Sequence, residues 1–90
     1  MNMNGYTFAM GAVLKNWREQ KSLTLSYIAE RQNIKESQLL RLERGEEVES
    51  FILLDYMDEV HRIDPEFDVL KAWRQELGFE KRNDSDIRQK

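Results

Sequence analysis

Apolar side chains in the first part of the chain recur at the spacing of one face of an α-helix. Met10, Val13, Leu14 and Trp17 follow the i, i+3, i+4, i+7 pattern and predict a helix over about 8–20. Glycine is sparse, proline occurs once, and charged residues are interspersed with apolar ones. This balance is typical of helices rather than sheets, so we expect an all-α fold.

Two shorter helices are predicted next, joined by a tight turn. Thr24 is a good N-cap for the first of them, which ends near Asn33, a residue that tolerates positive φ. The second is expected over about 35–44 and ends at Gly45. The apolar residues expected to face inward from this pair are Leu25, Ile28, Ala29, Ile34, Leu39 and Leu42.

The second half of the chain predicts two further helices. Ser50 is a suitable N-cap for a helix that ends near residue 63. The expected apolar side of that helix comprises Leu53, Tyr56, Met57 and Val60. Asp64, Pro65 and Glu66 form a helix start signal, and Gly78 is placed to end a helix over 65–77. The apolar stripe of this last helix comprises Phe67, Leu70, Trp73 and Leu77.

A chain of 90 residues has room for one hydrophobic core, which we place in a single domain over 8–78. Residues 1–7 are expected to form a flexible N-terminal arm. Residues 79–90 are expected to form a disordered tail, because Ile87 is the only apolar residue after residue 79. Neither a cationic start followed by an apolar run nor a stretch of about 20 apolar residues is present. We therefore expect a cytoplasmic protein without a membrane partner.

Four short patterns occur in order between residues 11 and 45. They are Gly11-xx-Leu14-xx-Trp17-Arg18, Leu23-Thr24-xxx-Ile28-Ala29-Glu30, Ile34-Lys35-Glu36-Ser37-Gln38-Leu39 and Leu42-Glu43-Arg44-Gly45. In register and without gaps, these patterns resemble the Cro and phage-repressor (XRE-type) family of helix-turn-helix proteins. The resemblance implies a lambda-repressor-like helix-turn-helix domain of about five helices. It also implies a structural ion pair between Arg18 and Glu43 that joins the third helix to the first.

In such proteins the third helix lies in the major groove of DNA, and the second crosses the backbone with its N-terminal amides at phosphate. The residues that would contact bases are Lys35, Glu36, Ser37, Gln38 and Arg41. Lys and Arg bond guanine, Gln bonds adenine, and Glu accepts from cytosine, so this set is able to read sequence. The residues that would contact phosphate are Thr24, Lys15, Arg31 and Arg44. The expected function is a sequence-specific transcriptional regulator of the repressor or autoregulator type.

Three departures from the family pattern weaken the expected phosphate contacts. Leu25 stands where the family commonly has a glutamine that bonds phosphate. The loop after Gly45 carries Glu46, Glu47 and Glu49, and Glu36 adds an acid to the proposed groove face. The net charge of −3 is also uneven, since residues 1–44 hold seven Lys/Arg against four Asp/Glu and residues 45–90 hold seven against thirteen. The long-range field therefore does little to hold the chain on DNA.

The stripe of Phe67, Leu70, Trp73 and Leu77 either caps the core or forms a twofold contact between two copies. A homodimer suits DNA, because two half-sites one helical turn apart in a palindromic operator multiply the base contacts. The alternative to DNA is the same fold used as a protein-interaction module, an adaptor or antitoxin-like partner with weak or no DNA binding. Bacterial cell-shape adaptors use a similar domain to hold a cytoskeletal filament.

An enzyme is not expected. The single histidine, His61, has no serine nucleophile arranged near it in the sequence, and no glycine-rich phosphate loop occurs. Without cysteine, and with one histidine, the chain has no disulfide and no Cys-type zinc site. We expect no catalytic residues, no metal and no cofactor.

Overall fold

The computed structural model describes residues 5–78, which form five α-helices and no strand, so the all-α prediction is confirmed for this part of the chain. The helices are α1 (Gly5–Gln20), α2 (Leu25–Gln32), α3 (Glu36–Glu43), α4 (Ser50–Ile63) and α5 (Val69–Leu77). None of these helices is both long enough and apolar enough to cross a membrane.

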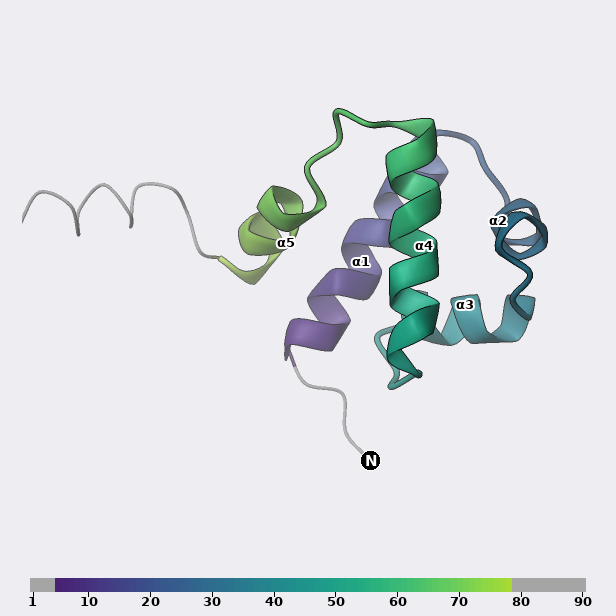
Figure 1. The fold of residues 1–90 in the computed structure, drawn as a ribbon. Helices are drawn as coiled ribbons and strands as arrows, with labels where there is room; N and C mark the ends of the chain where they lie inside the picture. Colours follow the sequence, from purple (N-terminus) through teal and green to yellow (C-terminus); the bar gives the residue numbers. More distant parts are fainter. Residues whose placement is uncertain (1–4, 79–90) are drawn as a thin grey trace, which may run out of the picture.

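The two long helices, α1 and α4, form the centre of the molecule (Figure 1). The pair α2 and α3 lies on one side of this centre and α5 lies on the other. α3 packs on both α1 and α4, whereas α2 packs on α3 and α4 and α5 packs on α1. In the view of Figure 1, α2 is seen nearly end-on while α3 lies across the picture, so the two short helices cross steeply.

The core lies where α1, α3 and α4 meet. The predicted apolar face of α1 is confirmed, because Met10, Val13, Leu14 and Trp17 are all buried. The other buried apolar residues are Ala9, Ile28, Ala29, Leu39, Leu42, Ile52, Tyr56 and Val60. On α4 the sequence pattern was partly misleading: Ile52 and Glu59 are buried, whereas Leu53 and Met57 are half-buried.

The turns around α2 and α3 agree with the sequence. The Thr24 hydroxyl oxygen accepts a hydrogen bond from the Tyr27 backbone N–H at 3.0 Å and caps α2. Asn33 ends α2 in the left-handed conformation, with φ of 58°, and Gly45 follows α3 with φ of 84°. Three residues, 33–35, separate the two helices, so a left-handed residue at Asn33 turns the chain within a very short connection.

The starts of α1, α4 and α5 differ from the prediction. α1 begins at Gly5, so residues 5–7 of the expected arm are helical, while residues 1–4 and the expected tail lie outside the described residues. Ser50 is the first residue of α4 rather than its cap, and Glu49 occupies the cap position without a side-chain hydrogen bond.

α5 begins at Val69 instead of residue 65, because Asp64 in the expected start signal binds α1 rather than capping α5. The Asp64 carboxylate accepts a hydrogen bond from Trp17 Nε1 at 3.1 Å and pairs with Lys21 Nζ at 3.1 Å. Phe67 packs against the Trp17 ring at a centroid distance of 6.5 Å. These contacts hold 64–67 against α1, and Asp68 caps α5 by accepting from the Lys71 N–H.

Gly11 marks the closest approach of α1 to α3. A Cβ built at Gly11 would lie 2.4 Å from the Leu42 carbonyl oxygen and 2.7 Å from the Glu43 carbonyl oxygen. Both contacts are to backbone atoms, which do not rotate away as a flexible side chain would. The absence of a side chain at residue 11 therefore sets the separation of α1 from the C-terminal end of α3.

Gly11→Ala is expected to destabilise the chain by about 1–3 kcal/mol, because the added methyl group forces the two backbones apart. Helix propensity alone would give the opposite sign, a gain of about 1 kcal/mol. Asn16→Ala, at an exposed position on the same helix, is the control and is expected to leave stability nearly unchanged. The free energy of unfolding from urea titration measures both, and a stabilised G11A protein would contradict the close packing.

Candidate nucleic-acid interface

The outward side of α3 carries the residues predicted to contact bases. Lys35, Glu36, Ser37 and Arg41 are exposed, and Gln38 is half-buried. Leu40, which the sequence prediction did not include, is 41% exposed on the same side. We call these six residues the recognition face. Helical periodicity gives the signal for Leu40, because Leu39 and Leu42 point inward and place Leu40 outside.

A groove runs between the recognition face and the loop of residues 46–49, here called the acidic loop. Lys35, Gln38 and Arg41 line the groove from the α3 side. The opposite side carries Glu46, Glu47 and Glu49, and apolar surface comes from Ile34, Val48, Phe51 and Ile52. The structure thus brings three of the five predicted base-contacting residues into one groove, with carboxylates facing them.

The two arginines on this side of the molecule bind the acidic loop. Arg41 Nε lies 3.2 Å from Glu46 Oε1, and Arg41 Nη2 donates to the Glu47 carbonyl oxygen at 3.1 Å. Arg44 Nε lies 3.4 Å from the other oxygen of the same carboxylate, Glu46 Oε2. Both arginines remain largely exposed, with 47% and 63% of their side-chain surface accessible. Their charge is therefore partly balanced within the chain.

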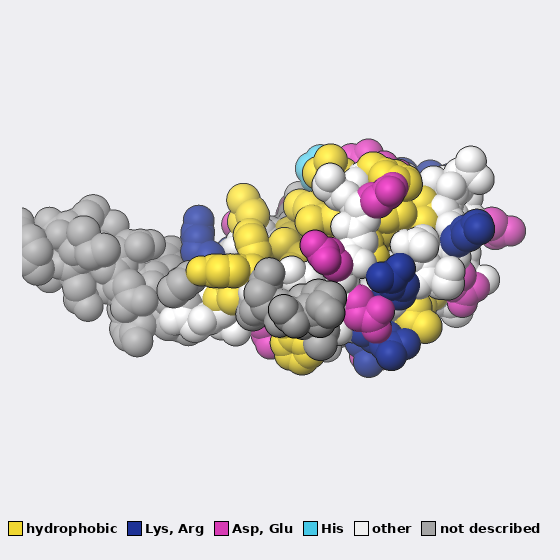
Figure 2. Space-filling model, turned by 90° about the horizontal axis from the view of Figure 1, so that it is seen from below, with side chains coloured by type: hydrophobic (Ala, Val, Ile, Leu, Met, Phe, Trp, Pro, Cys, Tyr) yellow, Lys and Arg dark blue, Asp and Glu magenta, His cyan; other side chains and the backbone are white. Residues whose placement is uncertain are grey.

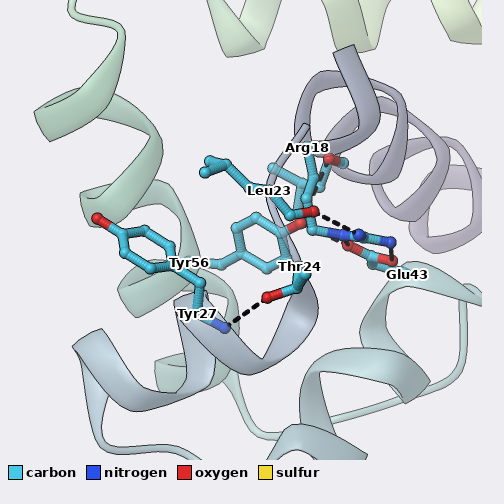
Figure 3. Close-up of polar contacts among 7 residues, drawn as sticks. Arg18, Leu23, Thr24, Tyr27, Glu43 and Tyr56 are labelled. Carbon is cyan, nitrogen blue, oxygen red and sulfur yellow. Dashed lines mark hydrogen bonds and ion pairs between the residues drawn. The ribbon is translucent and has the colours of Figure 1, made fainter. Parts of the chain in front are cut away.

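The inward side of α3 is fixed by a buried polar network (Figure 3). Arg18 donates two hydrogen bonds to the Glu43 carboxylate, from Nε at 2.7 Å and from Nη2 at 2.9 Å, which confirms the predicted ion pair. Arg18 Nη1 also donates to the Leu23 carbonyl at 2.9 Å, just before α2. The Tyr56 hydroxyl donates to Glu43 and lies 3.3 Å from the Leu14 carbonyl oxygen. The network thereby connects α1, α3 and α4.

Burial and the neighbouring carboxylate set the protonation of this network. Burial, together with the hydrogen bond to Glu43, raises the pKa of Tyr56 far above its ordinary value. The hydrogen bond that Arg18 donates to the Glu43 carboxylate raises the pKa of Arg18 despite the opposing effect of burial. Both shifts favour the protonated forms, so Tyr56 is held as a hydrogen-bond donor and Arg18 as a cation.

A second buried carboxylate holds α2. Glu59 on α4 is fully buried and accepts hydrogen bonds from Gln32 Nε2 at 2.8 Å and from Arg31 Nε at 3.2 Å. Arg62 donates to the same carboxylate from Nε at 3.1 Å and also binds the Tyr27 hydroxyl at 3.0 Å. No local sequence pattern marks Glu59 as buried, because its partners on α2 lie more than twenty residues away.

Three of the residues predicted to contact phosphate lie on two different helices, α1 and α2, or at their ends. Thr24 lies at the N-terminus of α2, where its oxygen caps the helix and its O–H proton remains available to an acceptor. Arg31 is paired with Glu59 and keeps 44% of its side-chain surface exposed. Lys15 is exposed on α1, one helical turn after Gly11, the residue that packs against the end of α3.

Among the described residues visible from below, basic and acidic side chains are interspersed rather than gathered into one basic region (Figure 2). Lys and Arg side chains lie beside Asp and Glu side chains, with hydrophobic groups between them. Any attraction to a polyanion on this face is therefore short-ranged and depends on the positions of individual side chains.

The apolar stripe predicted as a contact between copies is used largely within the chain. Phe67 packs on Trp17, and Trp73 packs edge-on against Tyr6 at 6.4 Å while Trp73 Nε1 donates to the Tyr6 carbonyl. Leu77 is half-buried, and Leu70 is 53% exposed. Of the four residues, Leu70 offers the most surface to a partner.

Comparison with models of known families, with characterised proteins and with solved structures gave no significant match.

Stability is expected to fall in acid through Glu59. Burial opposes its charged form, but the hydrogen bonds from Arg62, Gln32 and Arg31 outweigh burial and lower the pKa of Glu59 below its ordinary value of 4.5. A carboxyl group whose pKa is lower in the folded than in the unfolded state stabilises the fold at any pH above the unfolded-state pKa. This stabilisation is lost as the pH falls through the folded-state pKa.

Glu59→Gln is expected to cost about 2 kcal/mol at neutral pH, because three donors lose a charged acceptor. It should also flatten the decrease in unfolding free energy as pH falls below the ordinary glutamate value of 4.5, by the contribution of about one titrating group. Asp58→Asn, an exposed acid on the same helix, is the control. Equal pH profiles for E59Q and the unsubstituted chain would show that Glu59 does not cause the acid dependence.

Proposed function

We propose that this chain is a helix-turn-helix regulator that binds double-stranded DNA sequence-specifically, with α3 in the major groove. One observation carries the proposal. The inner side of α3 is fixed by Gly11 and by the Arg18, Glu43 and Tyr56 network, while the recognition face points outward. A short helix that is anchored on one side and polar on the other suits insertion into the groove.

The chemistry of the recognition face supports sequence reading. Gln38 offers both a donor and an acceptor to adenine, and Lys35 and Arg41 offer donors to guanine. Leu40 adds an apolar contact of the kind that thymine methyl groups accept. Thr24 and the N-terminal amides of α2 supply a position for phosphate, which fixes the register of α3 along the duplex.

A homodimer on a palindromic operator completes the proposal. A single module of this size makes few base contacts, and two copies multiply them. The contact between copies is assigned to α5, where Leu70 is exposed and Leu77 is half-buried next to residues that already pack on α1.

A protein-interaction module is the second candidate. Phe51, which lines the groove beside the acidic loop, and Leu54 lie one turn apart at the start of α4 and are 51% and 61% exposed. Exposed large apolar side chains next to a charged groove are also typical of protein-docking surfaces. Failure to bind random duplex even at low salt would favour this candidate over DNA.

Gln38→Ala is expected to weaken operator binding by about 1–3 kcal/mol and to relax the preference at one base position. The measurement is a gel shift on a palindrome upstream of the chain's own gene, chosen as one on which footprinting first detects protection by the unsubstituted chain. Gln75→Ala, the same change at an exposed position on α5, is the matched control. Unchanged affinity and sequence preference in Q38A would remove α3 from the interface.

Leu70→Lys is expected to raise the dimer dissociation constant at least about tenfold, since it places a charge in an apolar contact. Leu54→Lys makes the same change at an exposed leucine on α4 and should leave the association unchanged. Sedimentation equilibrium measures both variants. Loss of the dimer in L54K, with L70K unaffected, would move the contact from α5 to α4.

A further inference from the structure

One carboxylate binds Arg41, which belongs to the recognition face, and Arg44, which follows it in the sequence. The two oxygens of Glu46 divide between Arg41, at 3.2 Å, and Arg44, at 3.4 Å. Arg41 has a second acceptor in the Glu47 carbonyl at 3.1 Å, so its guanidinium is directed toward the acidic loop. This arrangement resembles the way a phosphate group accepts hydrogen bonds from two arginines.

The pairing is weak enough to be exchanged. Glu46 keeps 35% of its side-chain surface accessible and both arginines keep more, so solvent and salt screen these ion pairs. By contrast, the Glu43 side chain that binds Arg18 is 2% exposed. Arg41 and Arg44 can therefore leave Glu46 for another anion without disturbing the core.

We infer that Glu46 is an internal competitor for DNA phosphate, an assignment that rests on the proposed DNA binding. A duplex that approaches α3 has to displace the Glu46 carboxylate before Arg44 reaches a backbone phosphate or Arg41 reaches a base edge. The displaced Glu46 carboxylate then lies near phosphates and takes up a cation from the solution. This uptake offsets part of the release of DNA counterions that accompanies binding. Glu46 thus lowers affinity for any duplex and makes binding depend on the base contacts of α3.

The test compares the full chain with its E46Q and E47Q variants on a random-sequence duplex, by fluorescence anisotropy over a series of NaCl concentrations. Both substitutions remove one negative charge from the same loop. E47Q keeps the backbone carbonyl that Arg41 uses, so it is the matched control.

E46Q is expected to bind the duplex about five- to tenfold more tightly at low salt, and E47Q no more than about twofold. The slope of log affinity against log salt should be steeper by about one in E46Q. In the DNA-free protein, the Nε–H signals of Arg41 and Arg44 in NMR spectra should shift in E46Q and not in E47Q.

Equal gains in E46Q and E47Q would overturn the role of Glu46 while leaving the proposed DNA binding intact. Arginine signals that do not respond to E46Q would likewise overturn it. Failure of all three proteins to bind duplex at low salt would overturn the proposed function, and this role with it.

Discussion

The position of α3 depends on the buried Glu43 carboxylate. A charged carboxylate in the interior costs several kcal/mol unless donors surround it, and here Arg18 and Tyr56 supply them from α1 and α4. The geometry of the two-pronged contact with Arg18 allows little sliding of α3 along α1. Gly11 adds a second constraint on the position of α3, because it allows α1 to approach the carbonyls at the end of α3. Because both constraints act on the inner side and the C-terminal end, the N-terminal residues of α3 stay exposed in a fixed orientation.

α2 is attached to the framework by the same physical means. Glu59 is buried on α4 and accepts from Arg31 and Gln32 at the end of α2, so each of the two short helices is tied to a long one by a buried glutamate. Short helices of eight residues are marginal by themselves and owe their stability to such tertiary contacts. Side-chain hydrogen bonds with defined directions specify how α2 and α3 cross more narrowly than apolar packing alone.

Local signals predicted most of the fold, and long-range contacts account for the errors. The apolar face of α1, the Thr24 cap and the left-handed Asn33 depend on neighbouring residues and are confirmed. The start of α5 was misplaced because Asp64 binds Trp17, which lies 47 residues earlier and leaves no mark in the local pattern. Glu59 resembled a surface charge for the same reason. On the candidate site, the exposed residues of α3 follow from helical periodicity, but the pairing of Arg41 and Arg44 with one glutamate required the path of the loop in space.

Burial distinguishes the ion pair on the inner side of α3 from those on its outer side. Arg18 is 13% exposed and faces a carboxylate that is 2% exposed, so breaking the pair would leave an unpaired charge in the interior. Arg41 and Arg44 pair with Glu46 at the surface, where water and salt compete with the carboxylate and the net stabilisation is small. The first pair therefore determines where α3 lies. The second belongs to the proposed competition with phosphate, and the two kinds of pair can change independently because they share no residue.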